Sequence, residues 1–378
     1  MTTASIQIRE VKSAKDLKRF ITFPWRIYRN DPNWVPPLIR EEKKLLTPGK
    51  NPFWNHAERA LFIAVKNGAA VGRIAAIKDH TFIDYHREAT GYFGFFESVN
   101  EPPVAAKLFS VVQNWLKKRG LKKMIGPLNP STNAICGFLL QGFDFPPKFM
   151  MPYTPPYYLN LAEASGLVKA KDLLAYRIPV PDKMNPRLEK LAGILKKKGL
   201  SIRNVDMKNF KSELELVRKI YNAAWADNWG FVPLTEAEVA QIAEEFKLIV
   251  DPDLCMIAEY EGEPAAMALA LPNINEAFRD LDGRLLPTGW AKLLYRLKVK
   301  PVRTFRLIVL GIREKFRGTK LGALSVQLYA EIHDRAYEAG YQEAEASWTL
   351  ADNDAINDGM EFMGADQYKT YRVFEKEL

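Results

Sequence analysis

The sequence predicts an α/β (α+β) protein of two similar halves in tandem, each a mixed central sheet flanked by helices. The first observation is length, because 378 residues are enough for two domains, each with its own core. The second is composition, since 47% hydrophobic and 26% charged residues are typical of a globular protein. The third is repetition: the order strand, helix, hairpin, strand, helix, strand occurs twice along the chain.

The first half, residues 1–183, supplies the first copy of this order. The pair Asn67-Gly68 predicts a tight hairpin, because this dipeptide adopts the backbone angles of a two-residue turn. Leu108, Val112 and Trp115 recur at helical spacing and predict the buried side of an amphipathic helix. The expected elements are strands 6–11, 60–65, 70–78, 91–100, 122–128 and 173–180, and helices from Ser13, over 104–119 and over 159–167.

A long irregular segment, residues 126–158, interrupts the first half. It is rich in proline and aromatic residues and too apolar for disorder, and ordered loops of this length often carry function. Its polar residues Asn133, Asp144 and Tyr153 are therefore substrate-binding candidates. A loop that only covers the sheet explains the segment equally well, so both interpretations stay open.

The second half, residues 184–378, follows a joint near residues 181–190 and repeats the order. Thr235 and Glu238, three residues apart, form a capping box that opens a helix. The expected elements are strands 200–205, 255–260, 264–271, 305–312, 344–350 and 367–375, and helices over 212–227, 235–249 and about 321–339.

The strand 305–312 runs into a helix through a loop that suits an anionic ligand. Unpaired amide groups and the dipole of a helix N-terminus attract anions, and glycines let a phosphate approach the backbone. The loop is not a P-loop, because Thr319 precedes Lys320 where a Lys-Ser/Thr pair is required, and the chain has no G-x-G-x-x-G fingerprint. Its basic and glycine residues are Arg313, Lys315, Arg317, Gly318, Lys320 and Gly322.

The segment from Arg317 to Ala323, R-G-T-K-L-G-A, resembles the acyl-CoA pyrophosphate loop of the GNAT superfamily (general-control-related N-acetyltransferases). That loop reads Gln/Arg-x-x-Gly-x-Gly/Ala, so Lys320 stands where the first glycine is usual. Asn353 falls at the family's spacing, and Met360 replaces the tyrosine that many members use as general acid. The resemblance implies an acyl-CoA co-substrate held by Leu310, Gly311, Ile312, Arg313, Arg317, Gly318, Thr319, Lys320, Leu321, Gly322, Ala323 and Asn353.

The resemblance covers both halves and implies two tandem GNAT-like domains, a degenerate one over 1–183 and one with the acyl-CoA loop over 184–378. In the first, Glu101-Pro102-Pro103 stands where basic and glycine residues are usual. Prolines lack the backbone donor and Glu101 repels phosphate, so this copy is expected not to hold CoA. A narrower resemblance, to GNAT-type bacterial ceramide synthases that N-acylate a long-chain amino alcohol from acyl-CoA, rests on segments 142–147, 150–158 and 368–372.

N-acyl transfer requires two bound reactants, donors for an oxyanion and a base for the amine proton. The resemblance implies backbone donors at Leu310 to Ile312. Glu345 is the candidate base, with Glu343 behind it, and Trp348 is a further substrate candidate. The alternative for either glutamate is a carboxylate on the surface of a strand, without a chemical role. Asn353, the second catalytic candidate, either touches the CoA arm or only caps its helix.

Residues 284–306 form an insertion with membrane character. They include many lysines and arginines and no acidic residue, and Trp290, Leu293, Leu294 and Leu297 lie on one helical face. A basic amphipathic helix with a tryptophan at its margin suits an anionic membrane surface. The alternative is a helix packed on its own domain with solvated basic residues.

Charge and composition narrow the partners. A net charge of +9 suits CoA, nucleic acid or an anionic membrane. Nucleic acid is not expected as a partner because no recognition module appears. The expected partner is a small-molecule or lipid amine substrate. Two distant cysteines and no secretory signal predict the cytoplasm, with peripheral attachment to the inner face of the membrane if the basic helix binds lipid. The histidines form no metal pattern, so no metal is expected.

Two other functions stay open. An aminoacyl-tRNA-dependent transferase on a tandem GNAT scaffold fits the positive charge and predicts salt-dependent tRNA binding. A non-catalytic membrane-surface protein with a decayed GNAT fold is supported by Lys320 and Met360. Release of free thiol from an acyl-CoA and an amine would distinguish the acyl-CoA-dependent enzyme from both.

Overall fold

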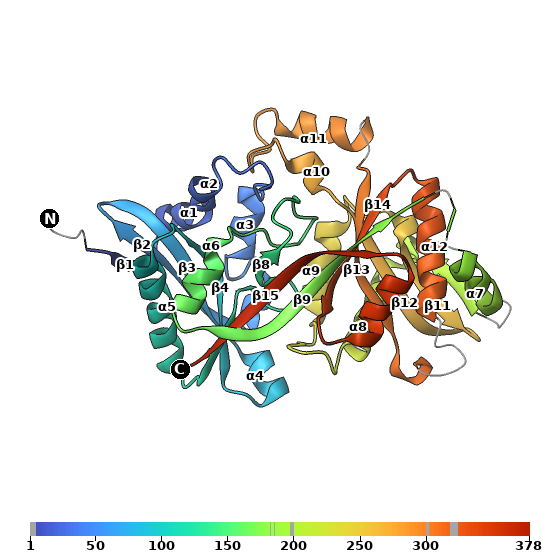
Figure 1. Cartoon of the computed structure of the whole chain (residues 1–378), viewed down its shortest axis with the longest axis horizontal. Helices are drawn as coiled ribbons and strands as arrows, with labels where there is room; N and C mark the ends of the chain where they lie inside the picture. Colours follow the sequence, from blue (N-terminus) through green and yellow to red (C-terminus); the bar gives the residue numbers. More distant parts are fainter. Residues whose placement is uncertain (1–4, 182, 185, 197–199, 300–301, 318–323) are drawn as a thin grey trace. The chain divides into compact units, whose positions relative to one another are not determined.

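The computed structural model describes the chain except for residues 1–4, 182, 185, 197–199, 300–301 and 318–323 (Figure 1). The chain forms two compact units. Unit 1 comprises Met1–Leu173, Phe278–Leu293 and Lys369–Leu378, and unit 2 comprises Leu174–Ala277 and Leu294–Tyr368. Each unit contains segments that are distant in sequence. The boundary between residues 183 and 184, which divides the sequence into two halves, therefore stays a prediction.

Unit 1 is a mixed sheet in the order β1-β2-β3-β4-β5-β15. The expected turn joins β2 to β3, with positive φ at both Asn67 and Gly68. The elements are β1 (Gln7–Glu10), α1 (Ala14–Thr22), α2 (Pro24–Ile27), α3 (Ile39–Leu45), the 3-10 helix η1 (Pro52–Asn55), β2 (Ala57–Lys66), β3 (Ala69–Asp79), α4 (His80–His86), β4 (Thr90–Ser98), α5 (Pro102–Lys117), β5 (Lys123–Gly126), β6 (Leu128–Asn129), β7 (Ile135–Cys136), β8 (Phe138–Gln141) and α6 (Tyr157–Ala164).

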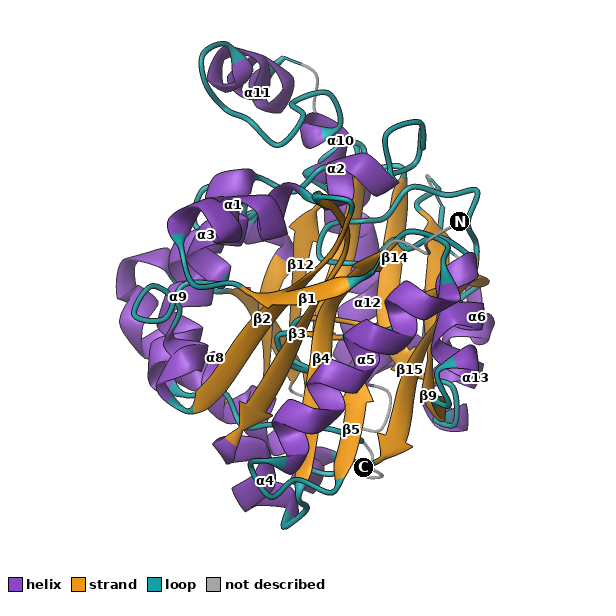
Figure 2. Cartoon of the chain, turned by 90° about the vertical axis from the view of Figure 1, so that its left-hand side faces the viewer, coloured by secondary structure: helices purple, strands orange, loops and turns teal. Residues whose placement is uncertain are grey.

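Helices α5 and α6 cover one face of this sheet, and α5 crosses its strands in Figure 2. Leu108 and Val112 of α5 and Tyr158 of α6 share a core cluster with Phe93 of β4. Helix α5 begins at Pro102 rather than at the expected residue 104. A proline in the first turn costs little, because its missing N–H would have no helical partner there.

The C-terminal strand joins the sheet of unit 1 beside β5. Strand β15 (Asp366–Glu377) pairs antiparallel with β5, Phe374 lying opposite Gly126. Arg372 of the same strand forms a hydrogen-bonded ion pair with Asp172, with Nε 2.8 Å from Oδ1. The sequence predicts the strand but not this partner.

Unit 2 is a mixed sheet in the order β9-β14-β13-β12-β11-β10. Its elements are α7 (Pro186–Lys196), β10 (Leu200–Asn204), η2 (Met207–Asn209), α8 (Phe210–Ala224), α9 (Glu236–Phe246), η3 (Pro252–Leu254), β11 (Cys255–Tyr260), β12 (Glu263–Pro272), β13 (Thr304–Ile312), η4 (Glu314–Phe316), α12 (Leu324–Glu338), β14 (Glu343–Leu350) and α13 (Asp354–Phe362). The division between the units falls within β9 (Val168–Pro179), α10 (Asn275–Phe278), α11 (Gly289–Lys298) and β15.

Helix α12 packs on one face of the unit 2 sheet, where Leu324, Leu328 and Ile332 share a core with Phe305 and Leu307 of β13. The predicted α/β class is confirmed, because both units repeat mixed strands flanked by helices. The capping box of Thr235 and Glu238 is present. Within the described residues, no helix combines the length and the apolarity that crossing a bilayer requires.

Candidate active site

The sheet of unit 2 opens between two parallel strands, β13 and β14. Their paired residues end at Leu307 and Ala346. Strand β13 continues to Ile312 and β14 to Leu350, so the two strand ends part beyond these pairs. Ligands of open α/β sheets bind in crevices at the carboxyl ends of such strands.

A β-bulge in β13 accounts for the opening. Leu269 of β12 pairs with Val309, but the next residue, Ala270, pairs with Leu307, so Ile308 is an extra residue in β13. A bulge bends its strand and increases the local twist. Strand β13 therefore turns away from β14 directly after their last pair.

Unit 1 carries a similar bulge, but its own chain fills the space. The register of β4 against β3 shifts beside Phe95, whose φ is 50°. The Oδ1 atom of Asn129 accepts a hydrogen bond from the Phe95 amide at 2.6 Å. A Cβ atom on Gly94 would lie 2.0 Å from the carbonyl oxygen of Leu128. Strand β6 thus lies directly against the bulge of β4.

A buried polar cluster lies at the base of the opening in unit 2. Arg306 and Glu345 occupy paired positions on β13 and β14, are 5% and 0% exposed, and approach to 3.7 Å. The Arg306 Nε atom donates to Ser347 Oγ at 2.7 Å, and Ser347 Oγ donates to Glu345 Oε1 at 2.6 Å. The Tyr368 hydroxyl donates to Glu345 Oε2. Both oxygens of the predicted base are therefore hydrogen-bonded.

The predicted donor strand has a different neighbour on each face. Leu310 and Ile312 pack against the α12-side core. A Cβ on Gly311 would lie 2.3 Å from Trp225 Cζ3, so glycine allows this ring to cover the strand. Trp225 stacks in turn on Tyr221 of α8, with ring centroids 4.9 Å apart.

The described residues of the anion loop are held by protein partners. Arg313 contacts Glu263 at 2.8 Å, and Lys315 pairs with the same carboxylate. Arg317 donates to the carbonyl oxygens of Ile312, at 2.9 Å, and Ala224. The remaining predicted CoA residues, Gly318, Thr319, Lys320, Leu321, Gly322 and Ala323, lie outside the described residues.

The predicted residues around α13 serve as a helix cap and as core. The Asn353 side chain accepts a hydrogen bond from the Ile356 amide at 3.3 Å, which agrees with its capping interpretation. Met360 is 4% exposed and packs in a core cluster with Tyr176 and Ala346. The hydroxyl of Tyr329 on α12 lies 3.8 Å from the Met360 sulfur.

The substrate candidates from sequence divide between the units. Asn133, Asp144 and Tyr153 belong to unit 1, and Trp348 belongs to β14 of unit 2. The Tyr153 hydroxyl lies 3.1 Å from Asp31 Oδ2, and burial followed by the charge of Asp31 raises the Tyr153 pKa to about 12. Asp144 is exposed beside this group.

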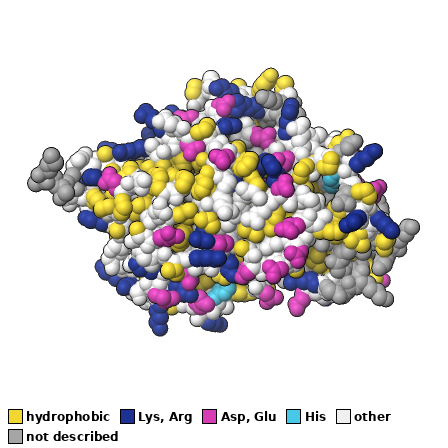
Figure 3. All heavy atoms as spheres, in the orientation of Figure 1, with side chains coloured by type: hydrophobic (Ala, Val, Ile, Leu, Met, Phe, Trp, Pro, Cys, Tyr) yellow, Lys and Arg dark blue, Asp and Glu magenta, His cyan; other side chains and the backbone are white. Residues whose placement is uncertain are grey.

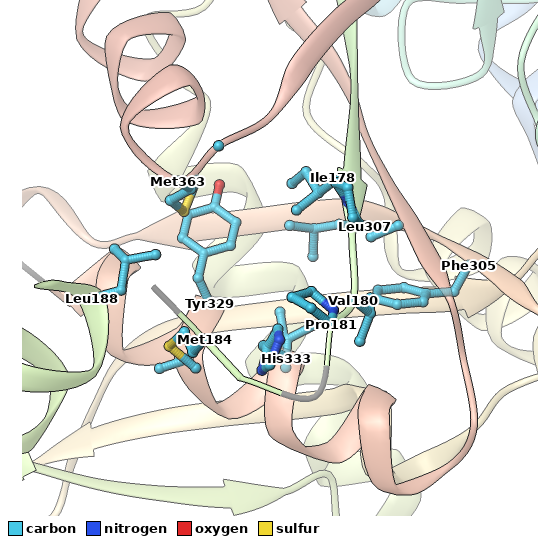
Figure 4. A pocket seen from close by; sticks show the side chains of 15 residues that line it. Ile178, Val180, Pro181, Met184, Leu188, Phe305, Leu307, Tyr329, His333 and Met363 are labelled. Carbon is cyan, nitrogen blue, oxygen red and sulfur yellow. The ribbon is translucent and has the colours of Figure 1, made fainter. Parts of the chain in front are cut away.

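An apolar pocket of about 280 Å³ lies in unit 2 between α7, α12 and β13 (Figure 4). Leu188 of α7, Phe305 and Leu307 of β13 and Tyr329 and His333 of α12 line it. The Nε2 atom of His333 is buried without a hydrogen-bond partner among the described residues.

Helix α11 carries an exposed apolar stripe. Trp290 and Leu294 lie about one helical turn apart on α11 and are 43% and 51% exposed, and Leu286, in the segment before the helix, is 76% exposed. Leu293 is buried, although the sequence places it on the same face as Trp290 and Leu294. Hydrophobic and basic side chains lie side by side over this helix in Figure 3.

The sequence counts Arg306 among the basic residues of the insertion 284–306, which is wrong because Arg306 is 5% exposed and bonds to Ser347. Ser347 and the bulge at Ile308 were missed. Arg306 carried a usable signal, because a charge within the apolar run 305–312 requires a buried partner. The bulge carried no such signal, because it depends on the register in which β13 pairs with β12. Among the described residues, no group of His, Cys, Asp and Glu side chains suits a metal ion.

Two curated relatives match nearly the whole chain. A bacterial ceramide synthase of Caulobacter vibrioides (strain NA1000 / CB15N) is 40% identical over 383 residues, which cover 100% of this chain and 99% of the relative. Protein YghO of Escherichia coli (strain K12) is 39% identical over 373 residues, 98% of this chain and 95% of the relative. No family model matches the chain.

Solved structures confirm the tandem GNAT fold. A tandem GNAT protein from the clavulanic acid biosynthesis pathway covers 99% of this chain, and this chain covers 98% of it, with a TM-score of 0.58 and 11% identity. A GCN5-related N-acetyltransferase from Sphaerobacter thermophilus matches 98% of this chain and 95% of its own, with a TM-score of 0.56 and 11% identity. At these identities the likeness establishes the fold alone.

Proposed function

The chain belongs to the tandem GNAT acyltransferase family that includes the Caulobacter vibrioides ceramide synthase, and we propose that it transfers an acyl group from an acyl-CoA thioester to a primary amine. The proposed acceptor is a hydrophobic amine such as a long-chain amino alcohol. The name of a relative 40% identical across the whole chain supports this acceptor class.

The opening between β13 and β14 is the observation that carries the proposal. Backbone groups beyond Leu307 and Ala346 no longer face a neighbouring strand across this gap. An extended thioester arm with amide groups can hydrogen-bond to such strand edges. Donors near the bulge at Ile308 can then stabilise the charge that develops on the thioester oxygen.

The loop before α12 is the proposed diphosphate site. Arg317 ties the end of β13 to the end of α8 through two carbonyl oxygens. We assign it a positioning role beside the loop residues 318–323. Loss of this tether would misplace the loop and weaken acyl-CoA binding without altering the Glu345 cluster.

The reaction needs one proton transfer from the acceptor. The amine nitrogen attacks the thioester carbon, the C–N bond forms, the C–S bond breaks, and CoA leaves as the thiolate. The amine proton passes to a base, for which we propose Glu345. Because both carboxylate oxygens are occupied, the proton reaches Glu345 through the hydroxyl of Ser347 or Tyr368.

We further propose that α11 brings the protein to an anionic membrane surface, where a lipid amine is found. The stripe of Leu286, Trp290 and Leu294 would enter the interface, and exposed Lys292 and Arg284 would face anionic headgroups. As part of the same proposal, this attachment is to the inner face of the cytoplasmic membrane.

A thiol-release assay tests the activity. Acyl-CoAs from C2 to C16 are combined with a long-chain amino alcohol, a polyamine and an amino sugar, and free CoA is measured together with the amide product. We expect product with the amino alcohol, and Arg317→Ala should raise KM for acyl-CoA. Absence of amide from every pair, with no thermal stabilisation by acyl-CoA, would refute the proposal.

A further inference from the structure

We propose that the apolar pocket of unit 2 binds the hydrocarbon chain of the acyl donor, an inference that rests on the acyl-CoA-dependent activity proposed above. The cavity measures about 280 Å³. At roughly 30 Å³ for a water-sized group, it has room for about nine such groups.

The chemistry of the walls selects a hydrocarbon. The lining side chains of Leu188, Phe305, Leu307 and Ile332 are hydrocarbon, and most of the pocket surface is apolar. An ammonium or phosphate group would lose its hydration there without a compensating partner, whereas an alkyl chain gains from leaving water. The buried Nε2 of His333 can hold one water at the wall.

The position of the pocket favours the acyl chain of the donor over the hydrocarbon chain of the acceptor amine. Leu307, which lines the pocket, is also the last residue of β13 paired with β14, so the pocket begins where the strands part. Tyr329 and His333 lie about 8 and 14 Å along α12 from Leu324, at roughly 1.5 Å per residue. A thioester arm anchored before α12 can span this distance.

The acceptor is assigned to the other face of the sheet. Paired positions alternate between faces, so Arg306 and Glu345 point away from the face on which Leu307 lines the pocket. An amine that delivers its proton toward Glu345 therefore approaches from the side opposite α12. The chain on the α12 side is then the acyl chain.

A series of S-alkyl-CoA thioethers tests the assignment, because these analogues bind without turnover. Dissociation constants are measured by titration calorimetry for chains from C2 to C14. We expect about fourfold tighter binding for each added methylene, with a plateau near nine carbons, where the pocket is full. Affinity independent of chain length, with normal C2 binding, would overturn the pocket assignment and leave the proposed activity intact.

Filling the pocket locates the chain. Ala330→Leu and Ala344→Leu each add three carbons to a lining position, and Ala223→Leu adds them to an exposed position of α8. In either filling variant, the affinity should stop increasing at an alkyl chain about three carbons shorter than in the wild type, and the affinity for the C2 analogue should stay within twofold. The control variant should show the same dependence of affinity on chain length as the wild type. A plateau unmoved in both folded variants would overturn the inference. Absence of C2 binding in the wild type would instead contradict the proposed function.

Discussion

Replacing Glu345 by Gln separates the structural role of this residue from its proposed chemical role. The carboxylate is 0% exposed and its nearest cation, Arg306, is 5% exposed. The substitution keeps the shape of the side chain but leaves a buried guanidinium without its counter-charge. Breaking a buried pair in this way costs about 3–5 kcal/mol, a large part of a typical unfolding free energy of about 5–15 kcal/mol.

The assay combines urea unfolding with thiol release for Glu345→Gln, Arg306→Met and the double variant. Both single variants should lose about 3–5 kcal/mol, and the double variant should lose less than their sum, because no unpaired charge remains. If Glu345 accepts the amine proton, kcat of the double variant stays at least about 100-fold low despite its regained stability. A coupling energy below about 0.5 kcal/mol would refute the buried-pair argument, and recovery of kcat with stability would refute the base.

Three further predictions use separate parts of the chain. Asn129→Ala leaves the bulge amide of β4 without its acceptor and should lower the unfolding free energy by about 1–3 kcal/mol, with acyl-CoA affinity unchanged in calorimetry; a matching loss of affinity would contradict it. Burial raises the Cys255 pKa from 9.0 to about 12, so unfolding stability should fall more steeply between pH 9 and 12 in wild type than in Cys255→Ala, and parallel curves would be the opposing result. Trp290→Glu with Leu294→Glu should reduce sedimentation with anionic vesicles more than tenfold, whereas Leu248→Glu, at an 83% exposed site, serves as the control that should not.

The candidate site could be predicted from sequence only in part. Local periodicity and a turn predict the strands 305–312 and 344–350, and Glu345 lies within the second. The burial of Glu345 was not predictable, since it depends on Arg306 and Ser347 arriving from paired strands. The sequence offered two roles for Asn353, and the structure gives a side-chain cap to the Ile356 amide.

The fold, too, could be predicted where signals are local but not where distant segments pair. Local signals such as Asn67-Gly68 and the Thr235 capping box appear where the sequence predicts them. The pairing of β15 with β5 was not predictable, because a strand pattern carries no information on which distant strand it joins. The division of the chain into units depends on that pairing.

The bulges of the two units add a second reason, beside Glu101-Pro102-Pro103, to propose that only one unit binds acyl-CoA. Both units contain a bulge beside a parallel strand pair, and a bulge leaves backbone groups that need partners. Unit 1 satisfies its bulge from within, through the Asn129 side chain. In unit 2, residues 309–311 pair with β12 on one side, and their pairing with β14 on the other side has ended at Leu307, so the backbone groups on that side can meet a ligand. The contact made by residues 128–129 is therefore a second feature, beside the charge at the helix start, that we expect to keep unit 1 from binding acyl-CoA.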